Sequence, residues 1–144
     1  MALTIYADKA EDGAQPRTVH AGLNTVVSTV TFGTSQGSDS STAAAGDIIR
    51  FVKLPHGATV TRVAFKAGRA DGAFDLGTSA TATLFADSAS AVVTLVQSAT
   101  NIPYTVSISD DAAVAYEYLQ GAITNAGATA GDTITVICDY IMSN

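Results

Sequence analysis

Apolar and polar residues alternate through the last run of the chain, from Thr133 to Met142. A period of two is the spacing of a β-strand, whose successive side chains point to opposite faces of a sheet. One face of the predicted strand is entirely apolar, and the other mixes Thr and Asp with two isoleucines. The first consists of Ile134, Val136, Cys138, Tyr140 and Met142, and the second of Thr133, Thr135, Ile137, Asp139 and Ile141. We expect this strand inside a sheet, with its second face only partly in water.

Six further segments have the short length and the β-branched or aromatic content of strands, and Gly, Ser, Asp or Pro separates most of them. Only residues 87–97 show helical spacing, and a short helix and another strand both remain open there. Many short strands with turn signals between them indicate a sandwich or barrel. We therefore predict an all-β protein, a single antiparallel β-sandwich with at most one short helix. The six segments are residues 26–32, 48–54, 59–66, 81–85, 102–107 and 114–119.

The tetrapeptide Leu54-Pro55-His56-Gly57 lies between two of these segments and contains one of the two histidines. Pro presets the backbone at the second position of a type I turn, and Gly accepts the positive φ that follows in a bulged hairpin. Turn chemistry thus accounts for the whole motif. We interpret His56 as an exposed corner residue of a hairpin.

A chain of 144 residues is long enough for one domain with a core of its own. Residues 1–16 form a predicted N-terminal arm, in which an apolar patch at Leu3, Ile5 and Tyr6 precedes a polar run, and residues 17–144 form the predicted sandwich. The alternating patch is suited to adding a strand to the sheet edge of a partner or of a neighbouring subunit. The alternative is an edge strand of the chain's own sandwich.

Composition and charge exclude several classes of protein. The chain is 47% hydrophobic and only 14% charged, with a net charge of −6 and a pI near 4.5. Its Lys and Arg residues are scattered singly, whereas a nucleic-acid surface needs clustered cations, so we expect no direct nucleic-acid partner. The single cysteine allows no internal disulfide. No apolar window is long enough to span a membrane and the N-terminus does not resemble a signal peptide, which predicts a soluble protein made in a cytoplasm.

The sequence offers no recognisable catalytic or metal-binding constellation. A Ser or Cys nucleophile needs a neighbouring base, and neither His20 nor His56 has such a setting. Cys138 lies in the middle of the apolar strand face, where we interpret it as a small buried hydrophobe. No run matches a calcium loop, a zinc site or a phosphate-binding loop. We therefore expect no enzymatic activity, no metal and no cofactor.

The last third of the chain has more apolar side chains than one face of one sheet needs. Either both sheet faces are buried within the sandwich, or the surplus forms a subunit interface. The candidate partner-binding residues are Tyr116, Tyr118, Ile137 and Ile141, together with Leu3, Ile5 and Tyr6 of the arm.

The order of these segments resembles a known family. A polar arm is followed by Val-Ser-Thr-Val-Thr-Phe at 27–32, a Ser-rich loop, and Gly-Asp-Ile-Ile-Arg-Phe-Val-Lys-Leu-Pro-His-Gly-Ala-Thr-Val at 46–60. Phe-Asp-Leu-Gly at 74–77 and Gly-Asp-Thr-Ile-Thr-Val-Ile-Cys-Asp-Tyr at 131–140 complete the pattern. Over most of its length the chain resembles small structural proteins of tailed bacteriophages, especially head decoration or cement proteins.

The resemblance implies a jelly-roll β-sandwich without catalytic residues. It implies a protein that is made in the host cytoplasm, lies on the exterior of the capsid in the virion, and binds there as a homotrimer. Its partner would be the major capsid protein, whose intersubunit contacts it would stabilise. A neck or tail module of the virion and a carbohydrate-binding sandwich are alternatives. The second usually exposes Trp or Tyr platforms, and this chain has no Trp and five Tyr.

Overall fold

The computed structural model describes eight stretches of the chain, and within them the secondary structure consists of ten strands and no helix. No helix in these stretches is therefore long and apolar enough to cross a membrane. The described residues are 4–7, 23–32, 46–67, 73–90, 96–98, 101–107, 116–124 and 132–142.

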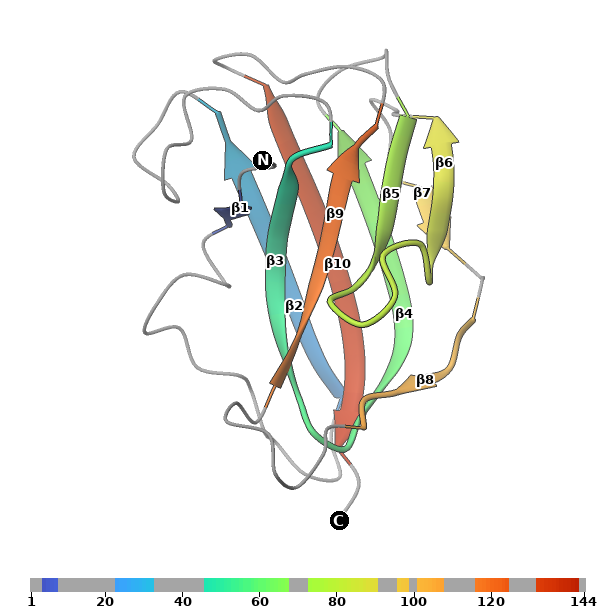
Figure 1. The fold of residues 1–144 in the computed structure, drawn as a ribbon. Helices are drawn as coiled ribbons and strands as arrows, with labels where there is room; N and C mark the ends of the chain where they lie inside the picture. The colour runs from blue at the N-terminus through green and yellow to red at the C-terminus, as the bar shows by residue number, and fades with distance from the viewer. Residues whose placement is uncertain are drawn as a thin grey trace.

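The strands form two sheets that face each other (Figure 1). One sheet, named here the β9 sheet, has the order β1 (Thr4–Tyr6), β3 (Ile48–Pro55), β9 (Tyr116–Ile123), β5 (Ala73–Thr78) and β6 (Ala86–Ser90). The other, the β10 sheet, has the order β2 (Leu23–Thr31), β10 (Thr133–Met142), β4 (Ala58–Ala67) and β7 (Val96–Ser98), and β8 (Tyr104–Thr105) also pairs with β4. The predicted all-β sandwich is confirmed. Its pairing is antiparallel except between β1 and β3, which run parallel.

The core lies between the two sheets and follows the alternation seen in the sequence. All five residues assigned to the apolar face of β10 are buried. Phe74 lies at the centre of an aromatic cluster, with ring centroids 5.2 Å from Phe65 and 6.4 Å from Phe51. Each fully buried side chain of this size contributes roughly 1.5–3 kcal/mol of hydrophobic stabilisation. Ser28 closes the sandwich between β2 and β3, because its hydroxyl donates to the carbonyl oxygen of Phe51 at 2.6 Å.

A β-bulge changes the side-chain phase of β4. Val60 and Val63 are three residues apart, yet both are fully buried in the core. The pairing of β4 with β10 shifts between these residues, so that Arg62 lies opposite Asp139 and Val60 opposite Tyr140. The extra residue turns Arg62 away from the core, where uninterrupted alternation would have directed it.

The Pro55-His56-Gly57 corner differs from the predicted hairpin. Gly57 has the expected positive φ, +84°, and His56 is exposed. However, β3 pairs within the β9 sheet and β4 within the β10 sheet, so the corner carries the chain from one sheet to the other. The residues of the turn determine the local reversal of the chain, but they do not determine which strands pair with β3 and with β4.

Residues 81–85 were expected to form a strand and instead form a turn between β5 and β6. The amide of Thr78 donates to the carbonyl oxygen of Thr81 at 2.9 Å, and the amide of Thr81 donates back to the Thr78 hydroxyl at 3.1 Å. The turn packs directly on Gly77, where any Cβ would clash with the backbone of Thr81 and Ala82. The missing side chain at Gly77 therefore gives the turn its position.

Other boundaries also differ from expectation. For residues 87–97 a helix and a strand were both open, and the described part is strand: β6 and β7 occupy the two ends, and residues 91–95 lie outside the described stretches. Of the strand expected over 102–107, only Tyr104–Thr105 forms, and the strand expected over 114–119 is β9, which continues to Ile123. Strand β5 was absent from the predicted set.

The apolar patch of the arm pairs within its own chain. Thr4–Tyr6 lie beside Ile48, Ile49 and Arg50 of β3, and the amide of Ala7 donates to the carbonyl oxygen of Arg50 at 2.8 Å. This is the arrangement of the second alternative, an edge strand of the chain's own sandwich. Residues 8–22 lie outside the described stretches, so the boundary at residue 16 stays a prediction.

Candidate interaction surfaces

The sequence-predicted partner-binding residues do not come together in one site. Tyr116 and Tyr118 lie on the outer face of the β9 sheet, because the residues that alternate with them point into the core. Ile137 and Ile141 lie on the outer face of the β10 sheet for the same reason. Ile5 and Tyr6 belong to the edge strand β1, whose side chains are not described, and Leu3 lies outside the described residues. The candidates therefore divide between two opposite faces of the sandwich and one edge.

On the outer face of the β9 sheet, two tyrosines and two cations form a compact group, the cation–aromatic cluster. The rings of Tyr116 and Tyr118 meet edge to face, with centroids 5.3 Å apart and planes inclined by 81°. The guanidinium carbon of Arg50 lies 4.2 Å from the Tyr118 ring centroid, and the ammonium of Lys53 lies 4.9 Å from that of Tyr116. Lys53 is only 6% exposed. The cations come from β3 and the rings from β9, so the cluster joins neighbouring strands.

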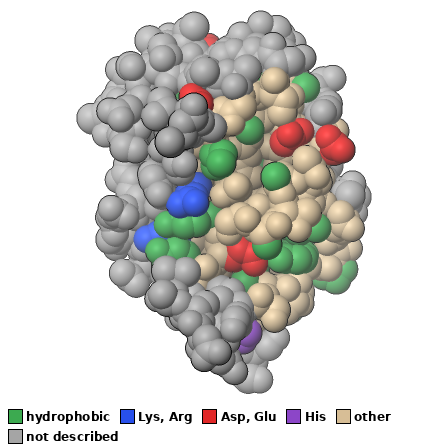
Figure 2. Space-filling model, viewed as in Figure 1, with side chains coloured by type: hydrophobic (Ala, Val, Ile, Leu, Met, Phe, Trp, Pro, Cys, Tyr) green, Lys and Arg blue, Asp and Glu red, His purple; other side chains and the backbone are tan. Residues whose placement is uncertain are grey.

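This arrangement engages the aromatic rings within the chain. Each cation–ring contact stabilises by roughly 0.5–2 kcal/mol, and more as water is excluded. Two perpendicular rings, each with a cation over it, do not offer the coplanar platform on which a sugar stacks. Figure 2 shows this outer face, with basic side chains on its left and acidic side chains on its upper right. The face also has a hollow of about 220 Å³, and Asp75 is the ionisable residue among its described lining residues.

On the outer face of the β10 sheet, aliphatic side chains remain exposed. Leu23 is 62%, Val27 49% and Ile141 42% exposed, and they are the exposed large hydrophobic residues of the described stretches. Strand register places Leu23 beside Ile141 and Val27 beside Ile137, so we name these four residues the aliphatic patch. The sequence reasoning missed Leu23 and Val27 because it began the strand at residue 26 and considered only the last third of the chain. The signal was the alternation of positions 23, 25 and 27.

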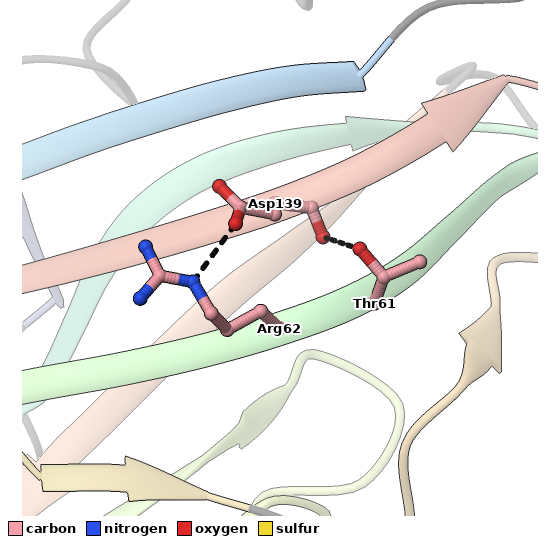
Figure 3. Close-up of polar contacts among 3 residues, drawn as sticks. All are labelled: Thr61, Arg62 and Asp139. Carbon is pink, nitrogen blue, oxygen red and sulfur yellow. Dashed lines mark hydrogen bonds and ion pairs between the residues drawn. The ribbon is translucent and has the colours of Figure 1, made fainter.

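An ion pair lies between the two halves of the aliphatic patch (Figure 3). The Nε of Arg62 donates to Oδ2 of Asp139 at 2.8 Å, and the hydroxyl of Thr61 donates to the Asp139 carbonyl oxygen at 3.3 Å. The side chains of Arg62 and Asp139 are 36% and 13% exposed. The pair thus joins β4 to β10 at the bulge that turned Arg62 outward.

Two ionisable groups of the described residues, one in the core and one at its border, have a raised pKa. Burial raises the pKa of Cys138 to about 12, with a further contribution from the charge of Asp139. Burial also raises the pKa of Tyr104, whose hydroxyl donates to the Glu117 carboxylate at 3.2 and 3.3 Å and feels its charge. Cys138 is fully buried, as predicted, and a neutral thiol is a poor nucleophile. No group of metal-ligating side chains occurs among the described residues, and His20 lies outside them.

Comparison with known proteins identifies the fold. No protein-family model matches the chain, and no curated protein matches its sequence. A chain from the capsid of Ralstonia phage GP4 superposes with a TM-score of 0.71 over 98% of this chain and 99% of that one, at 15% identity. A chain from the cyanophage Pam1 capsid asymmetric unit gives a TM-score of 0.62 over 93% and 99%, at 18% identity. Because each alignment covers nearly all of both chains, the neighbours are close to this chain in size. The likeness shows a shared fold and assigns no role to any residue.

Proposed function

We propose that this chain is a structural protein of a tailed-phage virion that binds the outer surface of the capsid and stabilises contacts between major capsid protein subunits. The observation that carries the proposal is the end-to-end match of the fold to chains in two phage capsid structures. A domain shared with a larger protein would align with only part of that protein. A sandwich of the same size in two capsids instead favours a small accessory chain of the shell.

The surface chemistry of the described residues supports a role in contact rather than in catalysis. The ionisable groups with a resolved pKa shift among the described residues are a buried thiol and a partly buried tyrosine bonded to a glutamate. On the surface, the two sheets present different outer faces, one aromatic and cationic, the other aliphatic. A chain with two unlike faces is suited to contacting different neighbours in a shell. The homotrimer would form through surfaces other than the outer face of the β10 sheet.

Co-sedimentation with empty capsids tests the proposal. Capsids that lack the protein are mixed with increasing amounts of it, pelleted and quantified. We expect saturable binding, a fixed ratio of copies to major capsid protein, and capsids that dissociate at a higher temperature when the protein is bound. Absence of the chain from the pellet at saturating concentration contradicts the proposal.

The principal alternative is a neck or tail module of the virion. Electron microscopy of virions carrying an antibody or gold label on the chain separates the two. Label distributed over the head supports the capsid role, and label confined to the neck or tail supports the alternative. Analytical ultracentrifugation of the free protein at micromolar concentration measures the expected trimer.

A further inference from the structure

The outward position of Arg62 is the starting point for a more specific site. Position 62 would face the core if β4 alternated without interruption, since Val60 and Val63 on either side of the bulge are both buried. Bulges are found where a strand re-aims a side chain for a purpose at the surface. Here the bulge places a guanidinium on the outer face of the β10 sheet.

The ion pair with Asp139 orients this guanidinium but leaves most of its donors available. Among the contacts within the described part of the chain, Arg62 donates through Nε alone. Its two terminal nitrogens point away from the Asp139 carboxylate (Figure 3). The terminal edge of a guanidinium is a planar fork that matches a carboxylate with two parallel hydrogen bonds. Asp139 thus holds the fork in place, while its charge partly offsets that of Arg62.

Aliphatic side chains lie before and after Asp139, the residue that holds the fork. Along β10, Ile137 and Ile141 lie two residues before and after Asp139, and Val27 and Leu23 lie beside them on β2. Two residues of a strand span about 7 Å. An extended segment with a carboxylate at one position and aliphatic side chains two residues before and after it has the same spacing. Such a segment would place its carboxylate at Arg62 and its aliphatic side chains on the two halves of the aliphatic patch.

Charge and area decide which occupant fits. The ionisable residues of this face in the described stretches are Arg62, Lys66 and Asp139, so it carries a net positive charge on a chain of net charge −6. An acidic segment is therefore attracted here. The strands β2, β10 and β4, which carry these residues, have a footprint of roughly 30 Å by 14 Å. That footprint matches one extended segment, and a contact of this size suits repetition across an assembly.

We propose that the outer face of the β10 sheet binds an extended protein segment in which an Asp or Glu lies between two aliphatic residues at i−2 and i+2. The terminal nitrogens of Arg62 bind the carboxylate, and the aliphatic patch binds its flanks. We identify the segment as part of the major capsid protein, and this identification alone rests on the proposed function.

The ligand chemistry is tested without capsids. The protein is isotope-labelled on Arg side chains and on Ile, Leu and Val methyl groups, and its NMR chemical shifts are followed at neutral pH. It is titrated with 4-methylpentanoate, with 4-methylpentan-1-ol as the uncharged control. We expect saturable shifts of the Arg62 Nε–H and of the patch methyl groups with the acid, and a response roughly tenfold weaker with the alcohol. Equal responses to the two compounds overturn the proposal.

Variants separate the fork from the charge. Arg62→Lys keeps a positive charge beside Asp139 but removes the fork of the guanidinium. We expect it to weaken acid binding roughly tenfold. Lys66→Met removes a charge of the same face but leaves the fork in place, so we expect a smaller loss of acid binding, of about threefold. The double variant Leu23→Thr, Val27→Thr changes two exposed positions of β2, keeps strand propensity and removes aliphatic surface. It therefore provides a folded test protein if Arg62→Lys proves unstable. A Lys66→Met loss equal to that of Arg62→Lys overturns the role of the fork.

Capsid co-sedimentation of the same variants distinguishes the two proposals. Wild type that binds while Arg62→Lys and the double Thr variant bind weakly supports both. Equal binding by all variants overturns this inference and leaves the proposed function standing. Wild type that shows the titration response but does not bind capsids removes the capsid partner and retains the ligand chemistry. Self-association that disappears in Arg62→Lys contradicts the inference, because the occupant is then a second copy.

Discussion

The two outer faces of the sandwich use their apolar and charged residues in opposite ways. On the β9 sheet, Tyr116 and Tyr118 contact cations from the adjacent strand, and Lys53 is almost fully buried. On the β10 sheet, Leu23, Val27 and Ile141 remain exposed and Arg62 is bonded through one nitrogen. A surplus of apolar residues in the sequence thus has two different outcomes. One face satisfies its residues within the chain, and the other leaves them exposed to solvent.

Neighbouring strands cause the difference. Strand β3 brings two cations beside the β9 tyrosines, and a cation and an aromatic ring satisfy each other. Strand β2 carries no charged residue and places aliphatic side chains beside those of β10. Aliphatic groups have no partner of that kind, so they stay exposed until another surface covers them.

The largest expected effect concerns Cys138, on the core side of the sheet whose outer face carries the aliphatic patch. The pKa of Cys138 is raised from 9.0 to about 12 in the folded chain, so the neutral thiol is favoured by folding. This contribution is complete below pH 9 and is lost as the pH rises toward 12, by about 1.4 kcal/mol per pH unit. Urea unfolding between about pH 8 and pH 11 should show a steeper loss of stability in wild type than in Cys138→Val. Tyr104 titrates alike in both proteins and cancels. Equal slopes would mean that water reaches the thiol through the β10 sheet.

Gly77→Ala tests how tightly the β9 face is closed by its own chain. The added methyl meets the backbone of Thr81 and Ala82 rather than a movable side chain, so the turn must shift. We expect a loss of about 3 kcal/mol in the free energy of unfolding, measured in urea. The matched change on the outer face of the β10 sheet, Val27→Thr, should alter the free energy of unfolding by no more than about 0.5 kcal/mol. An unchanged free energy of unfolding in Gly77→Ala would show that the turn is not packed on β5.

Deletion of residues 1–7 tests the edge strand β1. It removes three parallel register pairs with β3 and the burial of Ala7, worth about 1–2 kcal/mol together. We expect a melting temperature lower by about 5 °C in calorimetry, with capsid binding retained. An unchanged melting temperature combined with lost oligomerisation or capsid binding would show instead that the arm acts between chains.

Tyr118→Leu and Ile141→Thr give the smallest and most direct contrast between the faces. Tyr118→Leu removes the contacts with Arg50 and Tyr116, so it should lower stability by about 1–1.5 kcal/mol and leave capsid binding unchanged. Ile141→Thr removes exposed surface, so it should cost about 0.5 kcal/mol and weaken capsid binding. Urea unfolding and co-sedimentation measure the two quantities. The opposite ranking in either assay would reverse our assignment of the faces.

The sequence predicted the core more successfully than the surface. Strict alternation identified both faces of β10, and most of β3 and β4, because burial depends directly on the period of a strand. Strand β5 escaped because Asp75 and Gly77 interrupt its apolar content. The outward turn of Arg62 was also unpredictable, since a bulge is a property of two paired strands and not of one. The partner-binding role of all seven candidate residues stays a prediction.

The Pro55-His56-Gly57 corner has a consequence for synthesis of the protein. Because β3 and β4 belong to different sheets, neither sheet can be completed from a continuous stretch of chain. Strand β10, near the C-terminus, lies between β2 and β4 and supplies the pairing for both. Among the described strands, a nascent chain therefore leaves β2 without its partner, and β4 paired only with β7 and β8, until β10 emerges from the ribosome. Contacts between residues far apart in sequence also slow folding. We expect the native state to form in one cooperative step once β10 is available to pair with β2 and β4.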